Sequence, residues 1–289
     1  MQPQDLIKGT IRLISLPEIF IKINEMVDDP ASSSSDIGKL ISQDPALTAR
    51  LLKIANSPLY GFPSKIDTVS RSITIIGIRG IRDLVLASST IEVLSKFSSE
   101  FIEMQYYWKH SICCAVYARL LAIQCNALHI EPYFVAGLLH DIGKLIILRK
   151  LPEMARESHL RADDSGLPLS QVEQEVIGFD HASVGAELLR FWRLPETILD
   201  AVTYHHQPGQ AQESPMSAAI VHIANSIAMA KHPMILREGQ QSTTAGSSPV
   251  VDPAAWTITG LTDDVLDTIQ EEAELQFNAM QQVLLGKAA

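Results

Sequence analysis

The stretch QDPALTARLLKIANSPLYG, residues 43–61, decides the fold class. Asp44 is predicted to cap a helix that begins at Pro45, because a carboxylate accepts from free backbone N–H groups and proline lacks one. Apolar side chains then recur at the spacing that predicts one buried helical face. They are Leu47, Leu51 and Ile54. The proline and glycine of NSPLYG end this helix.

Helical periodicity continues on both sides of this stretch. We expect a bundle of roughly five helices in the N-terminal part and a second helical series after residue 105. The β-branched segment TVSRSITIIGI, residues 68–78, is the best strand candidate. The flanking helical patterns and a C-terminal cap at Gly77 favour helices at 67–76 and 78–96 instead.

The sequence therefore predicts an all-α protein in which an N-terminal helical bundle, 1–100, packs on a second helical domain, 101–237. Residues 238–253, EGQQSTTAGSSPVVDP, have the composition of a flexible loop. The C-terminal helix segment, 254–289, is expected to hold a final amphipathic helix over about 262–285.

Charge and composition limit the function classes. Of the 289 residues, 46% are apolar and 19% charged, which is enough to build a core, and the net charge of −10 argues against a generally anion-binding surface. Residues 41–96 nevertheless hold seven Lys or Arg against four Asp or Glu. Their segment TIIGIRGIRDLV resembles a helix-turn-helix, with Arg79 and Arg82 available to nucleic acid. A solvated face explains these charges equally well, so nucleic acid is the least favoured partner.

The cellular compartment is predicted from what the sequence lacks. The start, MQPQDLIKGTIRLISLPEIF, has no long apolar core of a signal peptide, and no apolar run approaches the roughly 20 residues of a membrane span. The cysteines, Cys113, Cys114 and Cys125, form no CxxC pair and are expected to be reduced. We expect a cytoplasmic protein without membrane contact.

Histidines are concentrated at predicted helix ends in the second half. They are His110, His140, His181, His205 and His206, and Asp141 directly follows His140. Imidazole and carboxylate ligands suit Fe, Mn, Zn or Ni, and a bridging carboxylate can serve two ions. Each histidine alone is more simply a packed core residue, and His205–His206 also suits a helix C-terminus. The ordered set favours a metal site.

The order of these residues resembles the HD superfamily of metal-dependent phosphohydrolases, and within it the HD-GYP phosphodiesterases. SLPEIFIKINEMVDDP, residues 15–30, followed by residues 41–87 around QDPALTARLLKIANSPLYG, resembles the HDOD domain. The resemblance covers about 12–235. It implies an all-helical fold and a role in bacterial signal transduction or regulation.

The HD-GYP resemblance also implies roles for individual residues. Asp141 would bridge two ions; His181, His205 and His206 would complete one site; His110 and His140 would begin the other. Lys144 would face a phosphate, and Asp141 and Lys144 would be the catalytic residues of an active enzyme. Asn225 stands where the superfamily has a last aspartate ligand, and QPGQ follows His206 in place of GYP. An amide oxygen is a weaker ligand than a carboxylate, so we expect one divalent ion rather than two.

Two functions follow from this pattern. The favoured one is a regulatory module that binds a signalling protein partner or a small nucleotide-like ligand, keeps part of an HD-type metal site and has weak or no catalysis. The alternative is a metal-dependent phosphohydrolase acting on a nucleotide or phosphodiester. The sequence is compatible with a homodimer but does not determine the oligomeric state.

Overall fold

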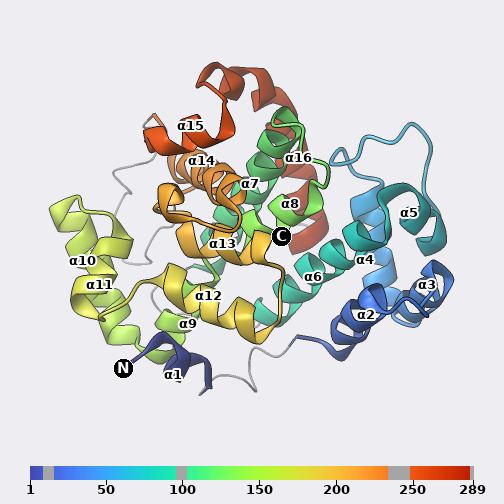
Figure 1. The fold of residues 1–289 in the computed structure, drawn as a ribbon, viewed down its shortest axis with the longest axis horizontal. Coiled ribbons are helices and arrows are strands. Elements are labelled where there is room, and N and C mark those ends of the chain that lie inside the picture. The colour runs from blue at the N-terminus through green and yellow to red at the C-terminus, as the bar shows by residue number, and fades with distance from the viewer. Residues whose placement is uncertain (9–15, 96–102, 234–247, 287–289) are drawn as a thin grey trace. The chain divides into compact units, whose positions relative to one another are not determined.

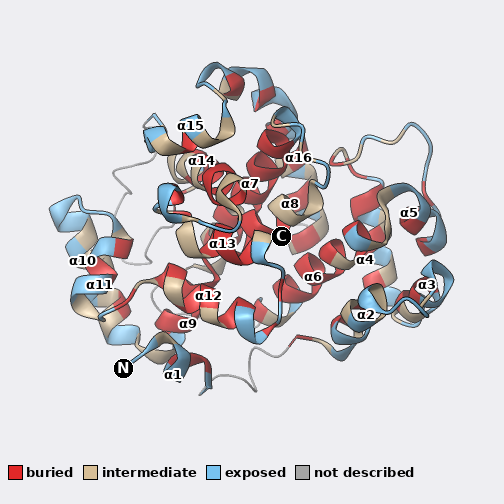
Figure 2. Cartoon of the chain, viewed as in Figure 1, coloured by how far each residue is buried: buried red, intermediate tan, exposed pale blue. Residues whose placement is uncertain are grey.

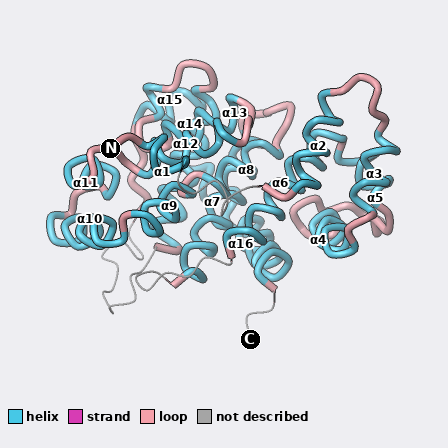
Figure 3. Tube along the Cα trace, turned by 90° about the horizontal axis from the view of Figure 1, so that it is seen from below, coloured by secondary structure: helices cyan, strands magenta, loops and turns pink. Residues whose placement is uncertain are grey.

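The computed structural model describes residues 1–8, 16–95, 103–233 and 248–286. Throughout these ranges the regular structure is helical and no strand occurs (Figure 3). The predicted all-α class is therefore confirmed. The segments that could have been read as strands carry strong helix starts and stops, and these local signals outweigh their β-branched composition.

The chain forms two compact units (Figure 1). The first, called here the histidine unit, comprises Met1–Ile14 and Phe97–Val265. The second, the bundle unit, comprises Ser15–Lys96 and Leu266–Ala289. The predicted domain boundary at residue 100 lies close to the observed one between Lys96 and Phe97. The two ends of the chain are exchanged between the units, however. Met1–Ile14 belongs to the histidine unit, and Leu266–Ala289 belongs to the bundle unit.

The bundle unit is a set of short helices around α6. Its helices are α2 (Glu18–Asp28), α3 (Ser34–Ser42), α4 (Pro45–Ala55), α5 (Val69–Ile76), α6 (Ile78–Leu94) and, from Leu266 onward, α16 (Asp264–Leu285). Helices α2, α4 and α5 all contact α6. A helix surrounded in this way buries apolar or small side chains on several faces, as α6 does.

The start of α4 forms as its sequence predicts. Asp44 accepts from the backbone N–H groups of Ala46 and Leu47 at 2.9 and 3.0 Å. Pro45 is the first helical residue. Leu47 and Leu51 are at most 1% exposed, so the predicted apolar stripe faces the core. Burying a leucine stabilises the fold by roughly 1.5–3 kcal/mol.

Gly77 separates α5 from α6 and explains why TVSRSITIIGI is not a strand. Its φ of 87° is a conformation that side-chain-bearing residues rarely adopt, and its N–H closes α5 by donating to Ile73 O. Just beyond, Arg82 forms an ion pair with Asp83 at 2.8 Å. The hypothesis of nucleic-acid binding needed both Arg79 and Arg82. Because Arg82 already pairs with Asp83, the structure gives this hypothesis less support.

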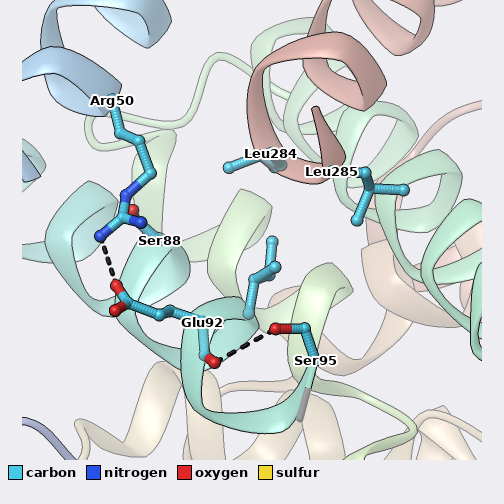
Figure 4. Close-up of a pocket in the computed structure, with 7 residues that line it drawn as sticks. Arg50, Ser88, Glu92, Ser95, Leu284 and Leu285 are labelled. Atoms are coloured by element: carbon cyan, nitrogen blue, oxygen red, sulfur yellow. Dashed lines mark hydrogen bonds and ion pairs between the residues drawn. The ribbon is translucent and has the colours of Figure 1, made fainter. Parts of the chain in front are cut away.

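A cavity of about 200 Å³ lies within the bundle unit, at α4, α6 and the end of α16 (Figure 4). Arg50 and Glu92 form an ion pair at its edge. Its lining is Arg50, Ser88, Ile91, Glu92, Ser95, Leu284 and Leu285. With both ion-pair partners partly exposed, this pair contributes about 0–1 kcal/mol to stability.

The histidine unit is built around α7. Its helices are α1 (Pro3–Lys8), α7 (Met104–Gln124), α8 (Glu131–Leu139), α9 (Ile142–Lys150), α10 (Pro152–Ser165), α11 (Leu169–Val176), α12 (His181–Phe191), α13 (Glu196–Tyr204), the 3₁₀ turn η1 (Pro208–Gln210), α14 (Pro215–Lys231) and α15 (Pro253–Thr259). Helices α8 and α14 lie along α7, and α7 is buried along most of its length (Figure 2). A helix that is apolar on all sides forms a core.

Two glycines let helices of this unit approach closely. A Cβ on Gly137 in α8 would lie 2.8 Å from Ala115 Cα and Cys114 O in α7. A Cβ on Gly143 in α9 would lie 1.9 Å from His181 O at the start of α12. Any larger residue would push these backbones apart, so glycine determines how near the ends of α8, α9 and α12 lie.

The C-terminal part holds one helix more than the sequence predicted. Of the expected flexible loop at 238–253, residues 238–247 lie outside the described residues. Helix α16 occupies Asp264–Leu285, close to the expected 262–285, and the short helix α15, which was not predicted, precedes it. Gly260 ends α15 in a left-handed conformation with a φ of 68°. No helix within the described ranges is long and apolar enough to cross a membrane.

Candidate metal centre

The histidine unit brings the predicted site residues together, four of the five histidines at helix ends and His110, against the prediction, inside a helix. His110 lies within α7, His140 and Asp141 form the junction of α8 and α9, and His181 is the first residue of α12. His205 and His206 follow α13. Their donor atoms form two groups, each within 4.8 Å: His181, His205 and His206, and His110, His140 and Asp141.

The first oxygen of Asp141 faces one histidine group. Oδ1 lies 3.2 Å from His181 Nε2 and 3.7 Å from His205 Nε2. His206 Nε2 lies 2.8 Å from His181 Nε2. Asp141, His181 and His205 are 0% exposed and His206 is partly exposed, so one carboxylate oxygen and three imidazole nitrogens share a largely buried space.

The second oxygen of Asp141 faces the other group and a lysine. Oδ2 lies 3.3 Å from His140 Nε2 and 3.5 Å from His110 Nε2. Lys144 Nζ donates to the same oxygen at 2.6 Å. The sequence assigned Lys144 to a phosphate; the structure places its ammonium on Asp141.

Backbone carbonyls fix which ring nitrogen of three histidines is free. A carbonyl oxygen can only accept, so each Nδ1 must carry the proton and each neutral ring has its lone pair on Nε2. The pairs are His110 Nδ1 with His232 O at 3.1 Å, His140 Nδ1 with Gly137 O at 2.7 Å, and His205 Nδ1 with Val202 O at 2.8 Å. The free nitrogens therefore point towards Asp141, as metal ligands with outer hydrogen bonds do.

Glu173 fixes His181 in the same way and was missed by the sequence analysis. Its Oε2 accepts from His181 Nδ1 at 2.5 Å and from the His181 backbone N–H at 2.8 Å. Glu173 is 3% exposed and lies in α11. Nothing in SQVEQEV distinguishes this glutamate from a surface residue, since its role depends on α11 packing beside α12.

The surroundings keep most of the imidazoles neutral and the carboxylate charged. Burial lowers the pKa of His110 to about 3 and holds the pKa values of His205 and His206 well below 6.5. Burial opposes the charge on Asp141, but His140 and Lys144 hold its pKa well below 3.8. Neutral imidazoles and an ionised carboxylate are the forms that bind a metal.

His181 is the exception. Burial disfavours its charged form, but the Glu173 carboxylate, which accepts from Nδ1, and the Asp141 carboxylate, 3.2 Å from Nε2, outweigh burial and raise its pKa to about 9. A metal ion would have to replace that proton at Nε2. The negative charge of Asp141, which favours a proton on His181 Nε2, would equally favour a metal cation bound to that nitrogen.

Other histidines support the cluster from outside. His222 Nδ1 donates to His205 O at 2.7 Å, and His222 Nε2 accepts from the Asp252 N–H at 2.9 Å. Both of its nitrogens are thus occupied by the backbone. His222 connects the start of α15 to the loop that carries His205 and is not itself among the grouped donors.

Unpaired buried atoms test whether a metal fits. Asp141 Oδ1, His205 Nε2 and Asn225 Oδ1 are buried and have no hydrogen-bond partner. Leaving such an atom unsatisfied costs about 1–3 kcal/mol. Donors spaced 2.8 to 3.7 Å apart bracket the about 3.4 Å that separates tetrahedral ligands 2.0–2.1 Å from an ion. These residues fit a divalent transition metal.

The fold and the site together define a helical protein with an HD-type histidine–aspartate centre. The family model of the HDOD domain matches residues 13–208, and the chain belongs to the HDOD domain family. The resemblance found in residues 15–30 and 41–87 is therefore confirmed.

Solved structures of other proteins share this fold, and a sequence relative is also known. An HDOD domain protein of unknown function from Geobacter sulfurreducens has 23% identity and a TM-score of 0.74, with 98% of each chain covered. A provisionally named phosphohydrolase from Shewanella amazonensis SB2B has 22% identity and a TM-score of 0.71, with 96% of each chain covered. An uncharacterized protein of Treponema pallidum (strain Nichols) is 28% identical over 200 residues, 68% of this chain but only 38% of the relative.

Proposed function

We propose that this chain is a bacterial signal-transduction module that holds one divalent transition-metal ion and has weak or no hydrolytic activity. The observation that carries this proposal is the burial of its donors together with their low charge. His110, His140, Asp141, His181 and His205 are all 0% exposed. A phosphodiester needs direct access to the ion that activates its attacking water, and among the ligands of the first group only His206 is partly exposed.

The donor set supports one ion held by its first group. His181, His205, His206 and Asp141 Oδ1 combine three neutral nitrogens with one anion. A bound ion would supply Lewis-acid polarisation of water or of a phosphate oxygen there. Two ions would clamp both the attacking and the leaving oxygen, but Asn225 adds no charge to hold a second.

In a regulatory protein, such an ion would stabilise the arrangement of helices and would not need to catalyse a reaction. The ion would tie the start of α12 to the end of α13 and to the α8–α9 junction. A signalling protein or a small nucleotide-like ligand would then act on that ordered arrangement. Membership of the HDOD family, which resembles the HD phosphohydrolases and implies a role in bacterial signalling, supports this proposal.

The alternative function is a metal-dependent phosphohydrolase. It is supported by the same histidine–aspartate order and by the fold shared with the provisionally named enzyme. We expect purified full-length protein to contain about one ion per chain and to hydrolyse bis(p-nitrophenyl) phosphate slowly or not at all. Brisk hydrolysis that Asp141→Ala abolishes would establish the alternative.

A further inference from the structure

Ser88, in the middle of α6, has a buried hydroxyl that is not hydrogen-bonded. The residue is 2% exposed, and its Oγ has no partner in the described part of the chain. Other helical serines donate to the carbonyl one turn earlier: Ser42 Oγ to Gly38 O at 2.7 Å, and Ser158 Oγ to Met154 O at 2.8 Å. A buried hydroxyl left unpaired is unfavourable, so a polar group brought to Ser88 would be stabilised there.

Arg50, in α4, has a second unpaired group beside the same cavity. Its Nη2 donates to the carboxylate of Glu92, but its Nε is buried and has no partner within the described ranges. Both side chains line the cavity of the bundle unit, as Ser88 does (Figure 4). Because an arginine Nε–H can only donate, this cavity holds two unpaired hydrogen-bond donors with a carboxylate close by.

The rest of the cavity is apolar. Figure 4 shows Leu284 and Leu285 across the cavity from the polar side chains. Ile91 and Leu284 are 4% and 9% exposed, whereas Glu92 and Ser95 are exposed. The volume of about 200 Å³ is smaller than the roughly 300–1,000 Å³ of sites for drug-sized ligands and cofactors. A nucleotide is therefore too large, and a small metabolite with an apolar part is the right size.

The unpaired groups define the chemistry of such a ligand. A carboxylate can accept from both Ser88 and Arg50 Nε, because it has two oxygens. A simple anion would also face the negative charge of Glu92, and like charges repel strongly where solvent is partly excluded. A ligand that carries an ammonium as well avoids this repulsion, because the ammonium donates to Glu92. Its net charge is then zero, as is that of the Arg50–Glu92 pair.

We propose that the cavity of the bundle unit binds a free aliphatic α-amino acid about the size of leucine. Its carboxylate accepts from the Ser88 hydroxyl and from Arg50 Nε–H, and its ammonium donates to Glu92. Its side chain lies against Ile91, Leu284 and Leu285. This site lies in the bundle unit and shares no residue with the metal centre, so it does not depend on the proposed function. It gives a signalling protein a small-molecule input.

The test is calorimetric titration of full-length protein with L-leucine in the presence of EDTA. We expect one saturable site per chain. Ser88→Ala removes one donor, and Arg50→Lys keeps the positive charge but removes Nε. Each should weaken binding roughly tenfold or more, as the loss of a hydrogen bond to a charged group does.

Two matched variants serve as controls for these substitutions. Ser72→Ala changes a buried serine of the same unit whose Oγ donates to Thr68 O at 3.1 Å, and Arg79→Lys changes an exposed arginine of α6. Neither residue lines the cavity, so both variants should bind leucine as the wild type does. Equal affinity in the wild type, Ser88→Ala and Arg50→Lys would overturn the proposal.

A ligand series on the wild type gives a second readout that needs no variant. Isovalerate lacks the ammonium, isoamylamine lacks the carboxylate, and both should bind at least tenfold more weakly than leucine. AMP should not compete with leucine. Absence of saturable leucine binding would overturn the proposal. Isovalerate or isoamylamine binding as tightly as leucine would overturn it too, because the ligand would then not be an amino acid.

Discussion

Glu173 accepts two hydrogen bonds from one residue, His181: from its ring Nδ1 at 2.5 Å and from its backbone N–H at 2.8 Å. A single carboxylate from α11 thus fixes both the main chain and the ring of the first residue of α12. The ring is held so that Nε2 faces Asp141 Oδ1, 3.2 Å away.

Glu173→Gln should therefore weaken metal binding without removing a ligand. Outer hydrogen bonds of this kind typically change metal affinity about 10- to 100-fold. Competition with a chromogenic chelator would measure the dissociation constant. Glu175→Gln, an exposed change in the same helix, is the control and should leave it unchanged. Equal affinities for both variants would show that Glu173 has only a packing role.

Asp141→Ala should abolish the response of stability to metal. A ligand that binds only the folded state adds about 2.7 kcal/mol at 100 times its dissociation constant. The wild type should therefore melt at a higher temperature with Mn²⁺ or Zn²⁺ than with EDTA. The variant should show one melting temperature in both conditions. A metal-induced rise that survives in Asp141→Ala would place the ion elsewhere.

Gly143→Ala should destabilise the histidine unit. The new Cβ would lie 1.9 Å from His181 O, so α9 and α12 must separate. Overpacking of this kind typically costs about 1–3 kcal/mol, occasionally more. Gly209→Ala is the control, since its Cβ would make an ordinary contact with Ala254 Cβ at 3.6 Å. Chemical denaturation compares the two, and equal midpoints would contradict the close approach.

Without metal, stability should fall as pH drops below about 6.5. The pKa of His110 is lowered from 6.5 to about 3, and those of His205 and His206 are lowered as well. The unfolded chain then binds more protons than the folded one across this window, so acid favours unfolding. Urea midpoints measured in EDTA from pH 4.5 to 6.5 should rise with pH.

His181 has the opposite sign. Although burial disfavours its charge, Glu173 and Asp141 raise its pKa to about 9, so its folded form keeps a proton that the unfolded form loses above 6.5. Stability from this residue is lost as pH rises through 9. The midpoints in EDTA should decline there in the wild type and decline less in Glu173→Gln. An identical alkaline decline in both proteins would exclude this role of Glu173.

Local sequence signals predicted the helices well because each depends on neighbours in the chain. The cap at Asp44 and the glycine turn at Gly77 need only a few adjacent residues. The final helix, expected at about 262–285, lies at Asp264–Leu285, whereas the short helix α15 that Gly260 ends was not predicted.

The candidate site was predictable in part. Its histidines and Asp141 recur in a recognisable order, and the structure brings them together, although His110 lies inside α7 and not at a helix end as predicted. Glu173 could not be found, because its contact with His181 exists only once α11 and α12 are packed. Lys144 was predicted as a site residue, but its contact with Asp141 was not. The resemblance assigned Lys144 to a phosphate, whereas one turn of helix places its ammonium beside Asp141.

The close approach of α8 to α7 at Gly137 has a consequence for how the centre tolerates change. Main-chain atoms, which every amino acid carries, set the separation of the two helices, and His140 follows three residues after that contact. Substitutions among leucine, isoleucine and valine elsewhere in the core change side-chain packing but not the separation of α7 and α8 at Gly137. Melting temperature and metal stoichiometry should therefore vary independently across such variants: the protein can become fragile long before its histidines move apart.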